Sequence, residues 1–310
     1  MRIARYNAVR EPVSRARTGA IVADGVIGDL RPGYAKYLLE EAGDSQGREI
    51  AALRIPADVR YILHVGEPAL SALETSAQWL SRVHAREPAA RGVDGEALFT
   101  PVAQARLHNP LKPSRIIVVE GGPAGDAAPT FVDWPSACVM GPVRDLPLPA
   151  SVKTLSFRAG LGVVIGRACR GIAEATAPGC VAGYTVANAV EGTGDIPYRR
   201  CIIGPCLVTP EDVREVAALR SATRVNGVAS ALAAASKWPL ARLVSKLSAY
   251  GLEPGDVIVA VESAQAGAQL RAGDVLETEI EGFGIMRNAV VAESGDAWKP
   301  RERTTSDIGG

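Results

Sequence analysis

The chain has 310 residues, 47% of them apolar, and its 34 Lys plus Arg balance 34 Asp plus Glu. This balance excludes the basic excess with which proteins bind nucleic acid or anionic lipid, so neither is an expected partner. No window approaches the ~20 uninterrupted apolar residues of a membrane span. The N-terminus also lacks the zones of a signal peptide. We therefore expect a soluble, cytoplasmic protein.

The first 95 residues have the pattern of a small α/β domain followed by a linker. Two apolar runs joined by Asp24-Gly25 predict a hairpin with a type I′ turn. Apolar spacing predicts helices at about residues 34–41 and 69–83. The charged stretch 86–95, which carries Pro and Gly, is interpreted as part of the linker.

From about residue 110 the pattern changes to short β-rich runs separated by Gly and Pro. A helix is expected at 240–247, with Gly251 as its C-terminal cap. We expect a β-rich mixed α/β domain over 96–292, and a loose polar tail over 293–310. The predicted strands are 116–119, 161–165, 201–208 and 257–261.

The five cysteines are odd in number and form no C-x-x-C pair, so neither disulfides nor a zinc site is expected. Cys201 and Cys206 are conceivable nucleophiles, but neither has an obvious histidine partner. We interpret them as buried, inert thiols.

Several segments of the large domain resemble the fumarylacetoacetate hydrolase family, in family order and at near-family spacing over roughly residues 110–290. The matching segments are VVIGR at 163–167, VAGYTVAN at 181–188, IGPCLVTP at 203–210, LEPGDVI at 252–258 and IEGFG at 280–284. The resemblance implies a curled β-sheet roll with a small N-terminal α/β domain, assembled as a homodimer through the large domain, whose apolar-rich segment 181–208 is intact. It also implies enolisable diketone or 2-oxo acid substrates, and a Mg²⁺ or Mn²⁺ ion held by two Glu and one Asp.

This chain departs from the family at all three metal ligands. Arg158 and Gly160 stand at the two Glu positions, and Ala189 stands at the Asp position. A hard divalent cation needs several oxygen ligands, mostly anionic, and these residues supply none. We therefore expect no metal and no other cofactor. The lost groups are expected to leave a larger, less charged cavity that suits a bulkier substrate.

Arg158 allows two interpretations. In the first, its guanidinium replaces the metal and donates forked hydrogen bonds to a carboxylate, enolate or 1,3-dicarbonyl. Glu262, Glu120 and Asp133 are then the candidate catalytic acids or bases. In the second, Arg158 points to solvent or forms a structural salt bridge with Glu262. In either case a buried guanidinium needs a carboxylate partner, and Glu262 is the first choice.

The substrate-binding candidates come from the same domain. Trp134 and Tyr198 are candidates to line a pocket for a planar substrate, although core packing explains them equally well. Asn188 lies in the matching segment beside the third ligand position, and Asp195 follows it. Asp195 is also a candidate acid or base.

Two functions follow from these observations. The first is a metal-independent enzyme that isomerises, cyclises, eliminates or cleaves an enolisable dicarbonyl or polyketide-like small molecule, in a biosynthetic pathway. The second is a non-catalytic homologue that binds a ligand or pairs with a metal-bearing paralogue. Because several positions have gained charge (Glu120, Asp133, Arg158 and Glu262), the first is favoured.

Overall fold

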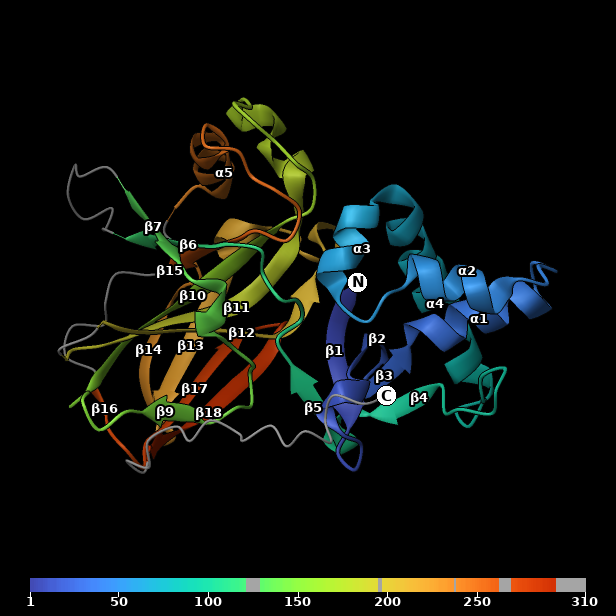
Figure 1. The fold of residues 1–310 in the computed structure, drawn as a ribbon, viewed down its shortest axis with the longest axis horizontal. Coiled ribbons are helices and arrows are strands. Elements are labelled where there is room, and N and C mark those ends of the chain that lie inside the picture. The colour runs from blue at the N-terminus through green and yellow to red at the C-terminus, as the bar shows by residue number, and fades with distance from the viewer. Residues whose placement is uncertain (121–128, 195–196, 237, 262–268, 294–310) are drawn as a thin grey trace, which may run out of the picture.

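The computed structural model of the protein describes residues 1–120, 129–194, 197–236, 238–261 and 269–293 (Figure 1). The predicted candidates Glu262 and Asp195 lie outside these ranges. None of the helices within them combines the length and apolar character that crossing a membrane requires.

Four helices, all in the N-terminal part, gather beside the strands of that part (Figure 1). They are α1 (Leu30–Glu40), α2 (Gly47–Arg54), α3 (Val59–Val65) and α4 (Glu67–Arg86), and the described C-terminal part adds α5 (Leu240–Ser248). The helices expected at 34–41, 69–83 and 240–247 are thus present as α1, α4 and α5. Gly251, the expected cap of α5, adopts φ 79°, a conformation that glycine reaches without steric cost.

Within the described residues, thirteen strands form one sheet whose main path runs β4-β3-β2-β1-β12-β11-β10-β15-β6-β7. On this path lie β1 (Arg2–Ala8), β2 (Arg17–Ala23), β3 (Val26–Asp29), β4 (Phe99–Pro101), β6 (Ile116–Glu120), β7 (Thr130–Trp134), β10 (Leu155–Ile165), β11 (Val181–Gly192), β12 (Tyr198–Val208) and β15 (Val257–Val261). Beside it pair β5 (Ala105–His108), β8 (Val139–Met140) and β16 (Gln269–Leu270). The path ends at β4 and β7 without closing into a barrel.

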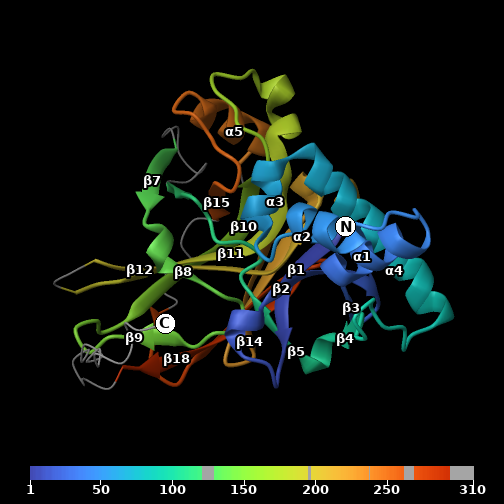
Figure 2. The ribbon, with the colours of Figure 1, turned by 45° about the vertical axis from the view of Figure 1, so that its right-hand side comes forward.

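A second sheet of five described strands, in the order β14-β13-β17-β18-β9, packs against the first. Its strands are β9 (Leu146–Leu148), β13 (Arg220–Val225), β14 (Val228–Ala234), β17 (Val275–Ile280) and β18 (Gly284–Ala292). Figure 2 shows the same arrangement from another side. The fold is β-rich mixed α/β, as the sequence predicted.

The hairpin at Asp24-Gly25 is present, but its turn is not the predicted type I′. Type I′ requires positive φ at both central residues, and among the described residues Asn226 is the one non-glycine with positive φ. Gly25 has φ 67°, and the pairing of β2 with β3 shifts register between Ile21 and Ala23. The extra residue of this bulge absorbs the twist that a type I′ turn would otherwise provide.

Each face of the large sheet belongs to a different apolar core. The inter-sheet face, which carries Phe157, Val186 and Ile202, packs against the second sheet. The outer face, which carries Ala187 and Ile203, joins a core that includes the N-terminal helices. Strand β1 pairs with β12, so both parts of the chain share one sheet. A domain boundary near residue 95 therefore stays a prediction.

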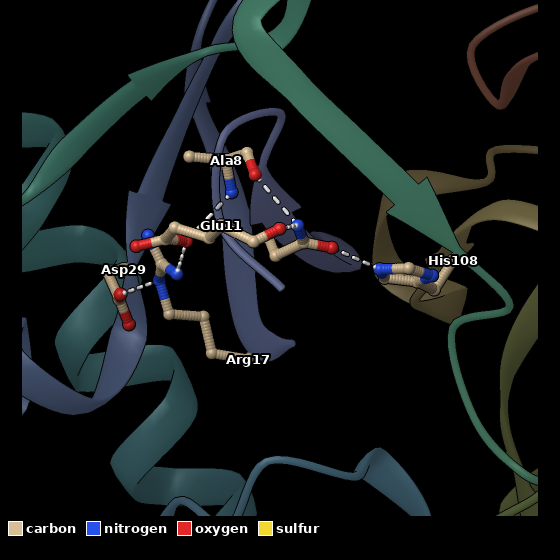
Figure 3. Close-up of polar contacts among 6 residues, drawn as sticks. Ala8, Glu11, Arg17, Asp29 and His108 are labelled. Atoms are coloured by element: carbon tan, nitrogen blue, oxygen red, sulfur yellow. Dashed lines mark hydrogen bonds and ion pairs between the residues drawn. The ribbon is translucent and has the colours of Figure 1, made fainter. Parts of the chain in front are cut away.

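An ionic cluster around the buried carboxylate of Asp29 joins the first three strands (Figure 3). The Arg17 guanidinium lies 2.6 Å from Asp29 and 2.5 Å from Glu11, and it also covers the ring of Tyr6 at 4.8 Å. Beside this cluster, Asn7 Oδ1 lies 2.5 Å from His108 Nε2. Burial raises the pKa of Asp29 from 3.8 to about 6, although Arg17 and Arg31 oppose the rise.

This raised pKa predicts a pH dependence of stability. Between about pH 4 and 6 the folded protein holds a proton on Asp29 that the unfolded chain releases, so the free energy of unfolding falls as the pH rises. When the pH drops from 7 to 4, the free energy of unfolding of the wild type should rise by about 1–3 kcal/mol relative to that of Asp29→Asn. Urea titrations of both proteins at several pH values measure this difference. Parallel pH profiles would show that the pKa of Asp29 is not raised.

Candidate functional site

The three positions at which the resemblance predicts the family's metal ligands meet on the outer face of the large sheet. In the pairing of β10 with β11, Arg158 lies directly opposite Ala189 and Gly160 opposite Ala187. Side chains two residues apart on a strand share a face, so the side chain of Arg158 and the Cα of Gly160 face the same side. The Arg158 side chain is 15% exposed, which places its guanidinium mostly out of water.

Arg158 is held by two carboxylates that come from either side of β10. Its Nη2 atom donates to Glu120 Oε1 at 3.2 Å and to Glu191 Oε2 at 3.0 Å. Glu120 ends β6, two strands away across β15, and Glu191 lies on the adjacent strand β11. The two carboxylates therefore balance the charge of a largely desolvated guanidinium, which would be costly to bury alone.

A second arginine extends the chain of charges. Arg199 Nε lies 3.4 Å from Glu191 Oε1, and the Arg199 guanidinium sits 5.3 Å from the ring centroid of Trp134. Trp134 is 2% exposed, and its indole N–H has no hydrogen-bond partner among the described residues. The array therefore contains two guanidiniums, two carboxylates and one aromatic wall.

The structure brings together part of the predicted site. Arg158, Glu120 and Trp134 share the outer face, and the expected carboxylate partner of Arg158 is present as Glu120. The first choice, Glu262, lies outside the described residues, as does Asp195. Glu191 was not predicted as a partner. It follows Ala189 by two residues, so the pairing of 158 with 189 makes it a diagonal neighbour of Arg158.

The other predicted residues lie away from Arg158. Asn188 is fully buried on the inter-sheet face and donates to Thr278 Oγ1 of the second sheet at 3.0 Å. Tyr198 belongs to the same inter-sheet core, and its hydroxyl donates to the carbonyl of Pro147. Asp133 is exposed beside Ile117, whose side chain faces the second sheet. Because alternate residues of a strand face opposite sides, these three do not join Arg158 in one site.

The space expected at Gly160 is absent. A Cβ atom added there would lie 2.7 Å from the Cα of Val261 and closer still to the carbonyl oxygen of Ala260. Strand β15 thus approaches β10 so closely that only glycine fits. Ala189 is 1% exposed and packs in the apolar core that contains Trp134 and Val261. The prediction of a larger cavity at these two positions is therefore wrong.

The cysteines fit the inert interpretation. All five are buried, and all five are free thiols. Burial raises the pKa of Cys206 to about 12, and burial also raises the pKa of Cys201. A thiol with a raised pKa holds little thiolate near neutral pH, so neither is an activated nucleophile.

The family model described as fumarylacetoacetate (FAA) hydrolase C-terminal matches residues 119–291, more than half of the chain. The chain belongs to this family. The protein Rv2993c of Mycobacterium tuberculosis is 31% identical over 214 residues, covering 62% of this chain and 80% of that protein. The 2,4-didehydro-3-deoxy-L-rhamnonate hydrolase of Sphingomonas sp. is 32% identical over 174 residues, covering 48% of this chain and 60% of that protein.

A solved structure extends the fumarylacetoacetate hydrolase-like fold to nearly the whole chain. Maleylpyruvate hydrolase from Sphingobium sp. SYK-6, crystallised with manganese(II) and pyruvate, matches with a TM-score of 0.69 and 21% identity. The match covers 95% of this chain and 100% of that one. It includes the N-terminal part of this chain, which the family model does not reach.

The residues at the expected ligand positions do not fit a divalent cation. They offer one guanidinium, one backbone without a side chain, and one methyl group, where Mg²⁺ or Mn²⁺ needs anionic oxygens. The nearby carboxylates of Glu120 and Glu191 both bind Arg158. In the ranges that the structure describes, no three His, Cys, Asp or Glu side chains gather as metal ligands.

The close approach of β15 to β10 makes Gly160 a sensitive position. Gly160→Ala should lower the free energy of unfolding by about 1–3 kcal/mol, because the added methyl group must push two strands apart. Gly179→Ala is the matched control, since a Cβ atom there meets nothing within 4 Å. Chemical denaturation of both variants measures the effect. Equal stability of the two variants would mean that the strands are not packed as described.

Proposed function

We propose that this protein is a metal-independent enzyme that acts on an enolisable dicarbonyl or polyketide-like small molecule, by isomerisation, cyclisation, elimination or C–C cleavage. The single observation that carries the proposal is the position of Arg158. It occupies a family metal-ligand position with its guanidinium largely buried between Glu120 and Glu191. A charged residue at one of the three expected ligand positions, rather than neutral packing at all of them, is the change expected if electrostatic chemistry is retained.

The array can carry out proton transfer next to a carbonyl. A bound substrate would displace one carboxylate from Arg158 and place its own carbonyl or enolate oxygens against the guanidinium. The displaced Glu120 or Glu191 would then accept the proton from the adjacent carbon, while the developing enolate charge rests on Arg158. Return of that proton to another carbon completes an isomerisation, with no oxidant and no leaving group.

Two residues of the same face suit the rest of such a substrate. Arg199 supplies a second, more exposed guanidinium, and the ring of Trp134, itself 2% exposed, lies behind that guanidinium. The similar Sphingomonas protein is named as a hydrolase of a 2,4-didehydro-3-deoxy sugar acid. Family members that match this chain include enzymes on dicarbonyl substrates, and we extend that class to this protein.

A non-catalytic role has its own support. In the described structure Arg158 is already neutralised, and Ala189 is packed in an apolar core. Both features favour a homologue whose site has become structural. The two functions differ in whether Arg158 is needed for turnover.

The decisive test is proton exchange at carbon, which does not require the natural product to be known. Wild-type protein in D₂O, offered a panel of 2-oxo acids and 1,3-diketones, should exchange the acidic C–H of at least one compound, followed by NMR. EDTA should leave the rate unchanged. Arg158→Ala should lower the rate by about 10²–10³-fold, as loss of a preorganised oxyanion donor does.

Arg158→Lys should restore little of this exchange, because the forked geometry is lost. Arg287→Ala is the control, since Arg287 is an exposed arginine paired with Glu277 on the second sheet. Full exchange by Arg158→Ala, or a wild-type rate that EDTA abolishes and Mg²⁺ restores, would contradict the proposal. No exchange by the wild type with any compound would favour the non-catalytic function.

We also propose a homodimer, on the family resemblance. Within the large domain, the apolar-rich segment 181–208 supplies the two central strands β11 and β12, which are buried on both faces within one chain. The five-stranded sheet instead exposes Val228, Ile285 and Val291. Light scattering at micromolar concentration should give twice the chain mass, and Ile285→Glu should reduce it. A monomer mass for the wild type would refute the dimer.

A further inference from the structure

A groove separates helix α4 from strands β1, β11 and β12 of the large sheet, at the start of β11 and the end of β12 and away from Arg158. It has a volume of about 540 Å³, within the range of small-molecule sites. One wall is a single stripe of α4, since its residues recur at helical spacing: Glu67, Leu70, Ser71, Glu74, Ala77, Gln78 and Ser81. The opposite wall is the short helix η5 (Pro210–Asp212) with Thr209 before it.

The floor of the groove is apolar. Ile3 and Leu207 come from the paired strands β1 and β12, and Val59 and Ile62 come from α3. Leu70 on the wall remains 37% exposed. An apolar ligand that covers these side chains gains the free energy of removing them from water.

All the charged side chains along the groove are acidic. Glu67 and Glu74 lie on the α4 wall, and Glu211 and Asp212 lie on the η5 wall. Among the described residues that line it there is no Lys, Arg or His side chain. Asp212 pairs with the Met1 amino group at 2.8 Å, and Glu74 accepts from Gln78.

The other two carboxylates are unpaired. Glu67 and Glu211 form no ion pair or hydrogen bond with the rest of the described chain. Glu67 lies on the α4 wall and Glu211 on the η5 wall, so a cation bound in the groove is attracted from both sides.

From the apolar floor and the two unpaired acids we infer that this groove binds an apolar small molecule that carries an ammonium or guanidinium group. The two features act on different parts of one ligand: the floor takes the hydrocarbon, and the acids take the cation. The Met1 ammonium also lines the groove, but Asp212 and Thr209 already hold it, so an anionic ligand of the same shape would meet the two unpaired acids. The site shares no residue with the Arg158 array, so it does not depend on the proposed function.

Three probes of equal chain length separate these contributions. Octylamine, 1-octanol and octanoate are titrated into the full-length protein by calorimetry, the two ionic probes below their micelle concentrations and octanol below its solubility limit. Octylamine should bind about five- to tenfold more tightly than octanol, because each of two exposed acids contributes modestly. Octanoate should bind least. Added salt should reduce the advantage of octylamine and leave octanol unchanged.

The double variant Glu67→Gln/Glu211→Gln should lower octylamine affinity to that of octanol. Glu49→Gln on helix α2 removes an exposed acid elsewhere and should change nothing. Leu70→Ser should weaken both octylamine and octanol. Arg158→Ala should bind octylamine like the wild type, which separates this site from the proposed catalytic one.

Equal affinity for octylamine and octanol in the wild type would overturn the inference, as would unchanged octylamine binding in the double variant. Light scattering of the same proteins tests whether a second copy of the chain, and not a small molecule, occupies the groove. If no probe binds and the double variant dissociates an oligomer, the groove is a protein interface and the inference falls.

Discussion

The antiparallel pairing of β10 with β11 is the constraint on which the site depends. The pairing runs from Leu155 opposite Gly192 to Ile165 opposite Val181. It places Phe157 and Val190 in the core between the sheets and Arg158 on the outer face. A slip of one residue would exchange the faces and bury the guanidinium between two apolar sheets. The apolar residues of β10 thus fix where Arg158 points.

Once Arg158 is on that face, its charge determines what surrounds it. A guanidinium that is 15% exposed loses much of its hydration, and an unpaired charge there would cost several kcal/mol. Glu191 is available because it lies diagonally across the same pairing, and Glu120 because β6 ends beside β15 at the same level. The two carboxylates therefore lie on strands of the same sheet as the arginine. An acid–base array also requires such fixed positions for its charged groups.

The sequence predicted what depends on local pattern and on family motifs. The strands at 116–119, 161–165, 201–208 and 257–261 were predictable because apolar runs bounded by turn residues need no knowledge of their neighbours. Glu191 could not be singled out, because its partner depends on strand register. Asn188 lies on the opposite face from Arg158 for the same reason. The face of the sheet on which a side chain lies depends on strand pairing and not on proximity in the sequence. The crowding at Gly160 comes from β15, about a hundred residues away in the chain.

The residues at the three expected ligand positions are part of the packing that surrounds them. Two small residues, Gly160 and Ala189, in place of carboxylates could by themselves leave empty space there. Instead, β15 lies against Gly160, Trp134 and Val261 pack in the same core as Ala189, and two glutamates hold Arg158. A carboxylate restored at position 189 would lie directly opposite Arg158 and pair with it before it could bind a cation. A carboxylate at 160 has no room for its Cβ atom. The charged array and the strand packing therefore form one arrangement, which no single substitution returns to a metal site.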